Sequence, residues 1–130
     1  MCFIKPLLIF NTFYLKYEAK IMASNNYQSN PYVGTEIKLN VSIDPIDGVT
    51  MDDYEFVIEA YCSTKRIQTI TKHEAQRIDR SNYKILLDTS VLGAGDLKCR
   101  ITAMIPDDDF EDGLRTEVAV VDTGITIVKS

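Results

Sequence analysis

Apolar and polar residues alternate with a period of two from residue 35 onward, and this constrains the fold more than any other feature of the chain. In the stretch EIKLNVSID the apolar residues are Ile37, Leu39, Val41 and Ile43. Successive side chains of a β-strand point to opposite faces of its sheet. The pattern therefore predicts an antiparallel strand with one face buried and the other facing water.

Four further segments predict strands. YEFVIEAYCS, NYKILLDT and LKCRITAMI alternate like the first, and the weaker pattern from Lys65 to Thr71 predicts a strand near a sheet edge. The residues expected to face inward are Phe56, Ile58, Ala60, Cys62, Tyr83, Ile85, Leu87, Leu97, Cys99, Ile101, Ala103 and Ile105.

The last strand, TEVAVVDTGITIVK, has an irregular pattern. Its expected inward residues are Val118 and Val120, then Ile125 and Ile127. These two pairs are out of phase by one residue, so we predict a β-bulge at 122–124 that absorbs the difference.

Helical patterns are confined to two short segments. TMDD, with Thr50 and Asp53, and TKHE each resemble a capping box for a single turn. About seven strands joined by turn signals predict an all-β chain, an immunoglobulin-like antiparallel β-sandwich with one or two single-turn helices.

The chain divides into residues 1–33, expected to be a leader and flexible N-terminal arm, and residues 34–130, the β-sandwich. Three interpretations are open for residues 1–21. They are a leader that is not translated, with Met22 as the start, a signal peptide, or an ordered segment. Residues 23–33 are polar and read as an arm. This arm either frays or orders on a neighbouring subunit through Tyr27 and Tyr32.

Charge and composition disfavour several functions. The formal net charge of −5 repels phosphate backbones, which disfavours nucleic-acid binding. The three cysteines Cys2, Cys62 and Cys99 show no CxxC spacing, and the single histidine His73 lies on an expected surface turn. We therefore predict no zinc site of the usual kind and no histidine base, and no metal or cofactor site is assigned.

The stretch IPDDDFEDGLRTEV concentrates carboxylates in residues 107–112. An EF-hand loop needs Gly at its sixth position and Glu at its twelfth, and neither possible register provides both. We expect a hairpin loop in which Asp112 and Gly113 make the turn and Phe110 points inward. A calcium site of another type is left open, and no catalytic residue is assigned.

Cys62 and Cys99 invite comparison with immunoglobulin domains, which join two sheets by a disulfide. Both are expected on inward faces. Leu97 stands where those domains place a tyrosine, and the chain has no tryptophan. Buried free thiols are the expectation, and a disulfide would require an oxidising compartment.

The segment from residue 83 to 127 carries a resemblance to a known group of proteins. Its marks are a strand ending in Asp-Thr-Ser, then LGAG, then a strand ending in IPD, then DFEDGLRTEV and TGITI. It resembles small proteins of phages and prophages of gut anaerobes, and the N-terminal β-sandwich domain of phage baseplate upper proteins. The resemblance covers about residues 35–128.

This resemblance implies a non-enzymatic structural or adaptor protein, a tail, baseplate or fibre component that contacts other virion subunits. It implies a homo-oligomer, assembled in the host cytoplasm and located in the virion, without nucleic-acid or membrane partners. The alternative is a secreted bacterial surface adhesin-type domain that binds calcium or carbohydrate.

Overall fold

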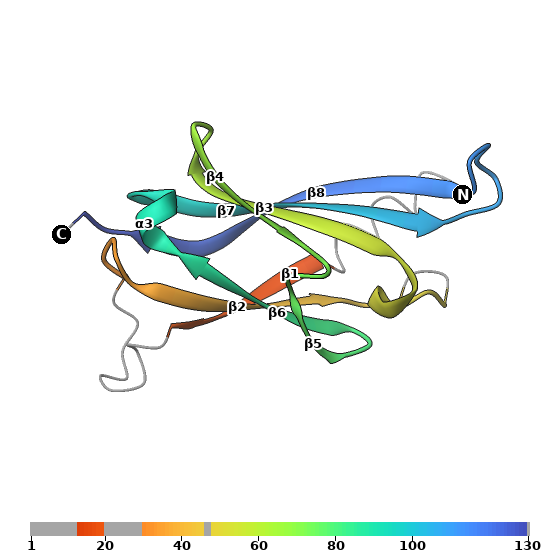
Figure 1. Cartoon of the computed structure of the whole chain (residues 1–130), viewed down its shortest axis with the longest axis horizontal. Coiled ribbons are helices and arrows are strands. Elements are labelled where there is room, and N and C mark those ends of the chain that lie inside the picture. The colour runs from red at the N-terminus through yellow and green to blue at the C-terminus, as the bar shows by residue number, and fades with distance from the viewer. Residues whose placement is uncertain (1–12, 20–29, 46–47, 130) are drawn as a thin grey trace.

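A computed structural model describes residues 13–19, 30–45 and 48–129 of the chain. Its strands form two antiparallel four-stranded sheets (Figure 1). The first sheet has the order β1-β2-β6-β5, with bounds Phe13–Ala19, Glu36–Ile43, Asn82–Asp88 and Gln76–Asp79. The second has the order β4-β3-β7-β8, with bounds Arg66–Thr71, Glu55–Ser63, Gly95–Pro106 and Leu114–Ile127. The prediction of an all-β fold of two antiparallel sheets is confirmed.

The inward side chains of both sheets form one hydrophobic core. It contains the predicted inward residues of β2, β6 and β7 and most of those of β3, each nearly inaccessible to water. Phe56 of β3 contacts Tyr83 of β6 edge to face across the two layers, with ring centroids 5.2 Å apart. Cys62, at the end of β3, is only half-buried beside this core.

Strand β8 corrects the predicted facing of Val118 and Val120. Ala119 is buried and Val121 packs against the core, whereas Val120 is 58% exposed. The bulge lies where it was predicted, since Thr123 and Gly124 fall within the register shift. However, Lys98 pairs with Asp122 and Asp96 with Thr126, so the single residue between them on β7 lies opposite three residues of β8. Because β8 gains two residues relative to β7 at the bulge, its side chains keep the same alternation. Odd-numbered residues therefore face inward both before and after the bulge.

Strand β1 lies inside the segment expected to be a leader and flexible arm. Phe13–Ala19 pairs antiparallel with β2, from Phe13 opposite Ile43 to Ala19 opposite Ile37. Near the end of the expected arm, Tyr32 forms a parallel bridge with Val128, and the Val33 N–H donates to the Val128 carbonyl at 2.9 Å. Both described segments are therefore paired through their backbones. Met22 and Tyr27 lie outside the described residues.

The short helices differ in part from expectation. Met51–Asp53 forms the 3₁₀ helix η1, and the Thr50 N–H donates to the Asp53 carboxylate at 2.8 Å, as a capping box predicts. The TKHE segment makes a hydrogen-bonded turn rather than a helix. A one-turn helix that the sequence analysis did not anticipate, α3 (Thr89–Leu92), follows β6. Asp88 caps its start, and Gly93 closes it at a φ of 78°.

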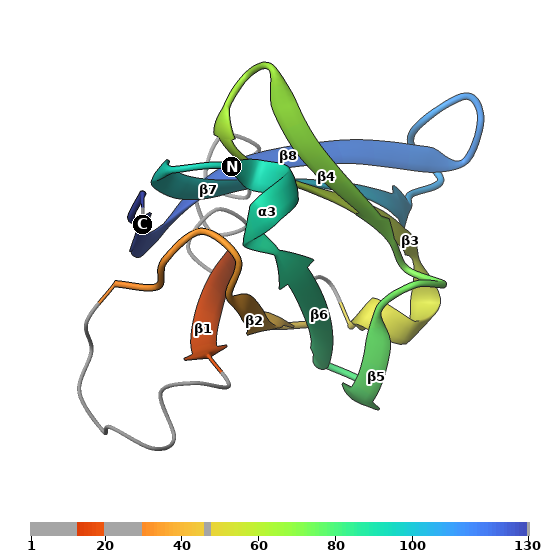
Figure 2. The same ribbon diagram turned by 60° about the vertical axis from the view of Figure 1, so that its left-hand side comes forward.

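Strand β4 contributes a hydrogen-bonded link between the two sheets. β5 covers only the first part of β6, so β6 ends without a β5 neighbour. There the Asp88 N–H donates to the Gln68 side-chain oxygen at 3.0 Å, and the Gln68 amide donates to the Leu86 carbonyl at 3.4 Å. Figure 2 shows β4 in the upper layer and β6 in the lower layer. The Gln68 side chain therefore forms hydrogen bonds with two backbone groups of β6 that a longer β5 would have bound instead.

Candidate functional site

The acidic loop 107–112 uses two of its carboxylates to hold its own backbone. Asp107 accepts from the Asp109 N–H at 3.0 Å, and Asp112 accepts from the Leu114 N–H at 3.1 Å. The Asp107 N–H also donates to the Gly113 carbonyl, which closes the hairpin. The predicted turn at Asp112 and Gly113 is confirmed. The predicted inward position of Phe110 is wrong, because that side chain is 48% exposed.

The base of this loop holds a largely buried ionic group. Arg115, on the inward-facing phase of β8, lies 2.6 Å from the Asp107 carboxylate and 3.0 Å from that of Glu117. The three side chains are only 14–17% exposed. A guanidinium between two carboxylates balances charge that would otherwise be costly to bury. The arrangement ties the loop to β8.

The two cysteines lie on neighbouring strands of one sheet. Cys62 ends β3 and Cys99 lies on β7, and both are free thiols. The disulfide of immunoglobulin domains joins two different sheets, so this placement does not reproduce it. Burial, and then the nearby Cys62, raises the pKa of Cys99 to about 12. Burial also raises the pKa of Cys62. Both groups stay protonated at neutral pH, which makes them poor nucleophiles.

His73 is exposed on the turn after β4, as predicted. Across the described ranges, no cluster of three or more His, Cys, Asp or Glu side chains is placed to hold a metal ion. No helix in those ranges has the length and apolar character needed to cross a membrane.

The outer face of the sheet β4-β3-β7-β8 carries apolar and charged side chains that are exposed or half-buried. The pairing register places its side chains in three rows across the strands. The rows are Thr71, Val57, Thr102, Val118; then Thr69, Glu59, Arg100, Val120; then Ile67, Tyr61, Lys98, Asp122. We call these residues the outer face. Apolar, aromatic and β-branched side chains make up most of the outer face, two opposite charges lie at its centre, and Lys98 and Asp122 add a second pair of opposite charges in the third row.

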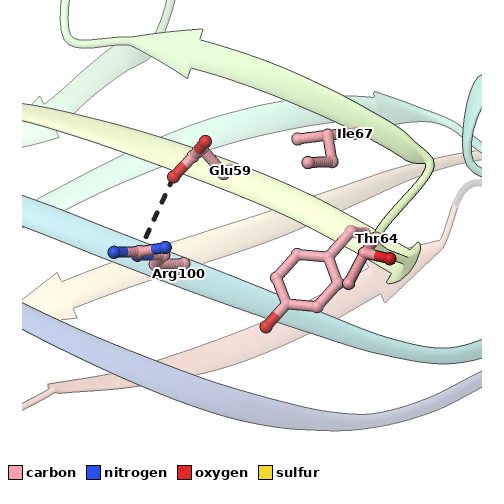
Figure 3. A pocket seen from close by; sticks show the side chains of 5 residues that line it. Glu59, Thr64, Ile67 and Arg100 are labelled. Carbon is pink, nitrogen blue, oxygen red and sulfur yellow. Dashed lines mark ion pairs between the residues drawn. The ribbon is translucent and has the colours of Figure 1, made fainter.

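Glu59 and Arg100 form that central pair. They are directly opposite in the register of β3 and β7, and their nearest charged atoms are 4.0 Å apart. The side chains are 35% and 54% exposed, respectively. Figure 3 shows both side chains above the ribbon, with Ile67 on the adjacent strand. The ion pair is too long for a hydrogen bond, so both groups keep capacity for another partner.

A shallow hollow lies over this pair. Glu59, Tyr61, Thr64, Ile67 and Arg100 line it, and its volume is about 140 Å³. Pockets for small organic ligands usually measure roughly 300–1,000 Å³ and enclose most of the ligand. The hollow therefore suits a side chain of another protein better than a metabolite. The sequence pattern did not indicate this surface, because Val118 and Val120 were expected in the core.

A second polar cluster joins η1, β5 and β6. The Arg77 guanidinium donates two hydrogen bonds of 2.9 Å to the Asp52 carboxylate, and the Tyr83 hydroxyl donates a third at 2.7 Å. Arg77, followed by Tyr83, lowers the pKa of Asp52 from an ordinary value of 3.8 to about 2. All three side chains are engaged with one another, so the cluster acts as a clamp across the end of the first sheet.

We expect this clamp to make stability depend on pH in acid. Because the pKa of Asp52 is lower in the folded state, its stabilising contribution is complete above about pH 4 and is lost as the pH falls towards 2. Urea unfolding of the native protein and of Asp52→Asn should therefore differ at about pH 6 and converge near about pH 2. Tyr83→Phe, which keeps the ring contact with Phe56, should show a smaller difference of the same sign. A difference independent of pH would contradict the assignment.

No protein family model, no curated protein and no solved structure matches the chain significantly.

Proposed function

We propose that this protein is a non-enzymatic structural or adaptor module of a phage particle, a tail, baseplate or fibre component that contacts other virion subunits. The observation that carries the proposal is the outer face. It is a four-stranded surface of exposed and half-buried side chains, in which exposed apolar residues such as Ile67 and Val120 lie near the Glu59–Arg100 pair. Protein interfaces commonly combine apolar and aromatic side chains with a limited number of polar contacts.

We further propose that the fold is immunoglobulin-like. The strand orders β1-β2-β6-β5 and β4-β3-β7-β8 support this. In chain order, β1 to β8 correspond to strands A, B, C, C′, D, E, F and G, which immunoglobulin domains arrange as ABED and C′CFG. The short helices η1 and α3 lie in the connections before β3 and after β6.

The sequence pattern that resembles phage proteins falls on positions that shape the backbone. Asp88 and Thr89 of the Asp-Thr-Ser element begin α3, and Gly93 of LGAG ends it. Asp107 of IPD and Gly113 of the following stretch close the β7–β8 hairpin. Residues that determine turns and helix caps are the ones that proteins with the same fold would be expected to share. This supports a structural role shared with such proteins rather than a common reaction.

Peptide mass spectrometry of purified particles tests the proposal. A lysogen that carries this gene would be induced, and particles would be separated on a density gradient, with the same fractions from uninduced cells as the control. We expect peptides from residues 34–130 to comigrate with the particle band in stoichiometric amounts. N-terminal peptides would show at the same time whether the mature chain begins at Met1, at Met22 or after a cleaved signal peptide.

A different location of the protein would contradict the phage proposal. A protein that is absent from particles but present in the secreted or envelope fraction, with a processed N-terminus, would overturn the phage proposal. It would support the adhesin-type alternative instead.

A further inference from the structure

We infer that the outer face binds a second copy of this chain, in a symmetric dimer whose two-fold axis runs parallel to strands β3 and β7. This inference deepens the proposed role in subunit contacts and rests on it. It commits to one occupant because the charges at the centre of the face are self-complementary in one orientation only.

The symmetry of the face follows from the strand register. Glu59 and Arg100 are neighbours on β3 and β7 in the middle row of the outer face. A two-fold axis along the strands exchanges the two strands when one face is laid on another. Glu59 of each copy then lies opposite Arg100 of the other, and two ion pairs form across the interface.

The other simple arrangement is disfavoured by the same residues. If the two-fold axis runs across the strands, Glu59 meets Glu59 and Arg100 meets Arg100. Like charges brought together at an interface are strongly unfavourable. The central pair therefore selects the orientation as well as the partner.

Most of the remaining residues of the face agree with the first arrangement, and Ile67, which would lie opposite Asp122, is the exception. Tyr61 of one copy would lie opposite Lys98 of the other, where an ammonium and an aromatic ring attract one another. Val57 would lie opposite Thr102, and Thr69 opposite Val120. The face contains two acidic and two basic side chains, so its formal net charge is zero, whereas the whole chain has a net charge of −5. Two acidic chains approach most easily where acids and bases alternate.

The size of the face suggests a modest affinity. Strands about 4.8 Å apart with a rise of about 3.4 Å per residue give this face of four strands and three rows an area of about 400 Å² per copy. Stable interfaces bury about 800 Å² per partner. We therefore expect a reversible dimer whose population depends on protein concentration. It should be fully formed only where a larger assembly holds two copies close together.

Charge reversal tests the inference directly. Sedimentation velocity over a concentration series should show a monomer–dimer equilibrium for the native protein. Glu59→Arg alone and Arg100→Glu alone should each weaken association about tenfold or more, because each places like charges opposite one another. An equimolar mixture of the two variants should associate again, since one copy then carries two arginines and its partner two glutamates. Lys84→Glu, on the opposite sheet, is the matched control and should leave association unchanged.

Three outcomes would overturn the inference. They are a monomer at every concentration, a dimer that is insensitive to both single reversals, and a mixture that fails to associate although circular dichroism shows both variants folded. None of these depends on particles. A native protein that stays monomeric yet is found in the particle band would refute this dimer and leave the proposed function intact. If the protein is absent from particles but the mixture of the two variants forms a dimer, the dimer would be supported and the proposed function refuted.

Discussion

Arg115→Met is expected to lower the free energy of unfolding by about 3 kcal/mol, the largest effect of any single substitution considered for this protein. Methionine keeps an unbranched stem but removes the cation. The carboxylates of Asp107 and Glu117, which are 17% and 15% exposed, would then lose the charge between them. Chemical denaturation monitored by far-ultraviolet circular dichroism at neutral pH measures the change.

Two companion variants separate charge from packing. Adding Asp107→Asn and Glu117→Gln to Arg115→Met should recover part of the loss, because no uncompensated charge remains. Arg100→Met removes an arginine from an exposed ion pair, and at low protein concentration it should change stability by less than about 0.5 kcal/mol. Equal losses for Arg115→Met and Arg100→Met would show that burial of the Arg115 group carries no special weight.

Thr89→Val is expected to destabilise the fold by about 2 kcal/mol. Thr89 is fully buried. Its hydroxyl donates to the Thr35 carbonyl at 2.7 Å and accepts from the Gly34 N–H at 2.8 Å. Valine has nearly the same shape, so the loss reports the hydroxyl and its two abandoned partners rather than a cavity. Thermal and urea unfolding measure it.

Thr89→Ser provides the control, because it keeps the hydroxyl and loses only a methyl group. We expect Ser to be the milder of the two substitutions. In Thr89→Val, amide hydrogen exchange should also accelerate at Gly34, whose N–H loses its acceptor. If Ser costs more than Val, packing of the methyl group governs this position and the hydrogen-bond account is wrong.

Several strands were predictable because their patterns are local. In β2 every second residue is apolar and its neighbours are polar, and β6 and β7 depart from this alternation only at Leu86 and Met104, so one face is strongly favoured to enter a core. The capping box of η1 was predictable for a similar reason, since Thr50 and Asp53 are three residues apart and satisfy each other's backbone groups. Such features need no knowledge of the rest of the fold.

Other strands could not be predicted from their sequence pattern. All four residues of β5 are exposed, so neither of its faces needs apolar side chains and no alternation of apolar and polar residues arises. Residues 118–121 of β8 are apolar without interruption, so both phases of a strand fit them equally well. The larger valines suggested the wrong phase, and the small Ala119 faces inward because its position opposite Ile101 on β7 decides which side is buried.

The sequence by itself therefore determined an all-β chain, the inward faces of its most regular strands, and the turn at the end of the acidic loop. Tertiary structure alone decided which strands became neighbours. It placed Cys62 and Cys99 on one sheet, added β1 beside β2, and set Glu59 opposite Arg100 at the centre of an exposed face. The physical reason is that alternation is a property of one strand, whereas register is a property of two, fixed only when both strands close over the same core.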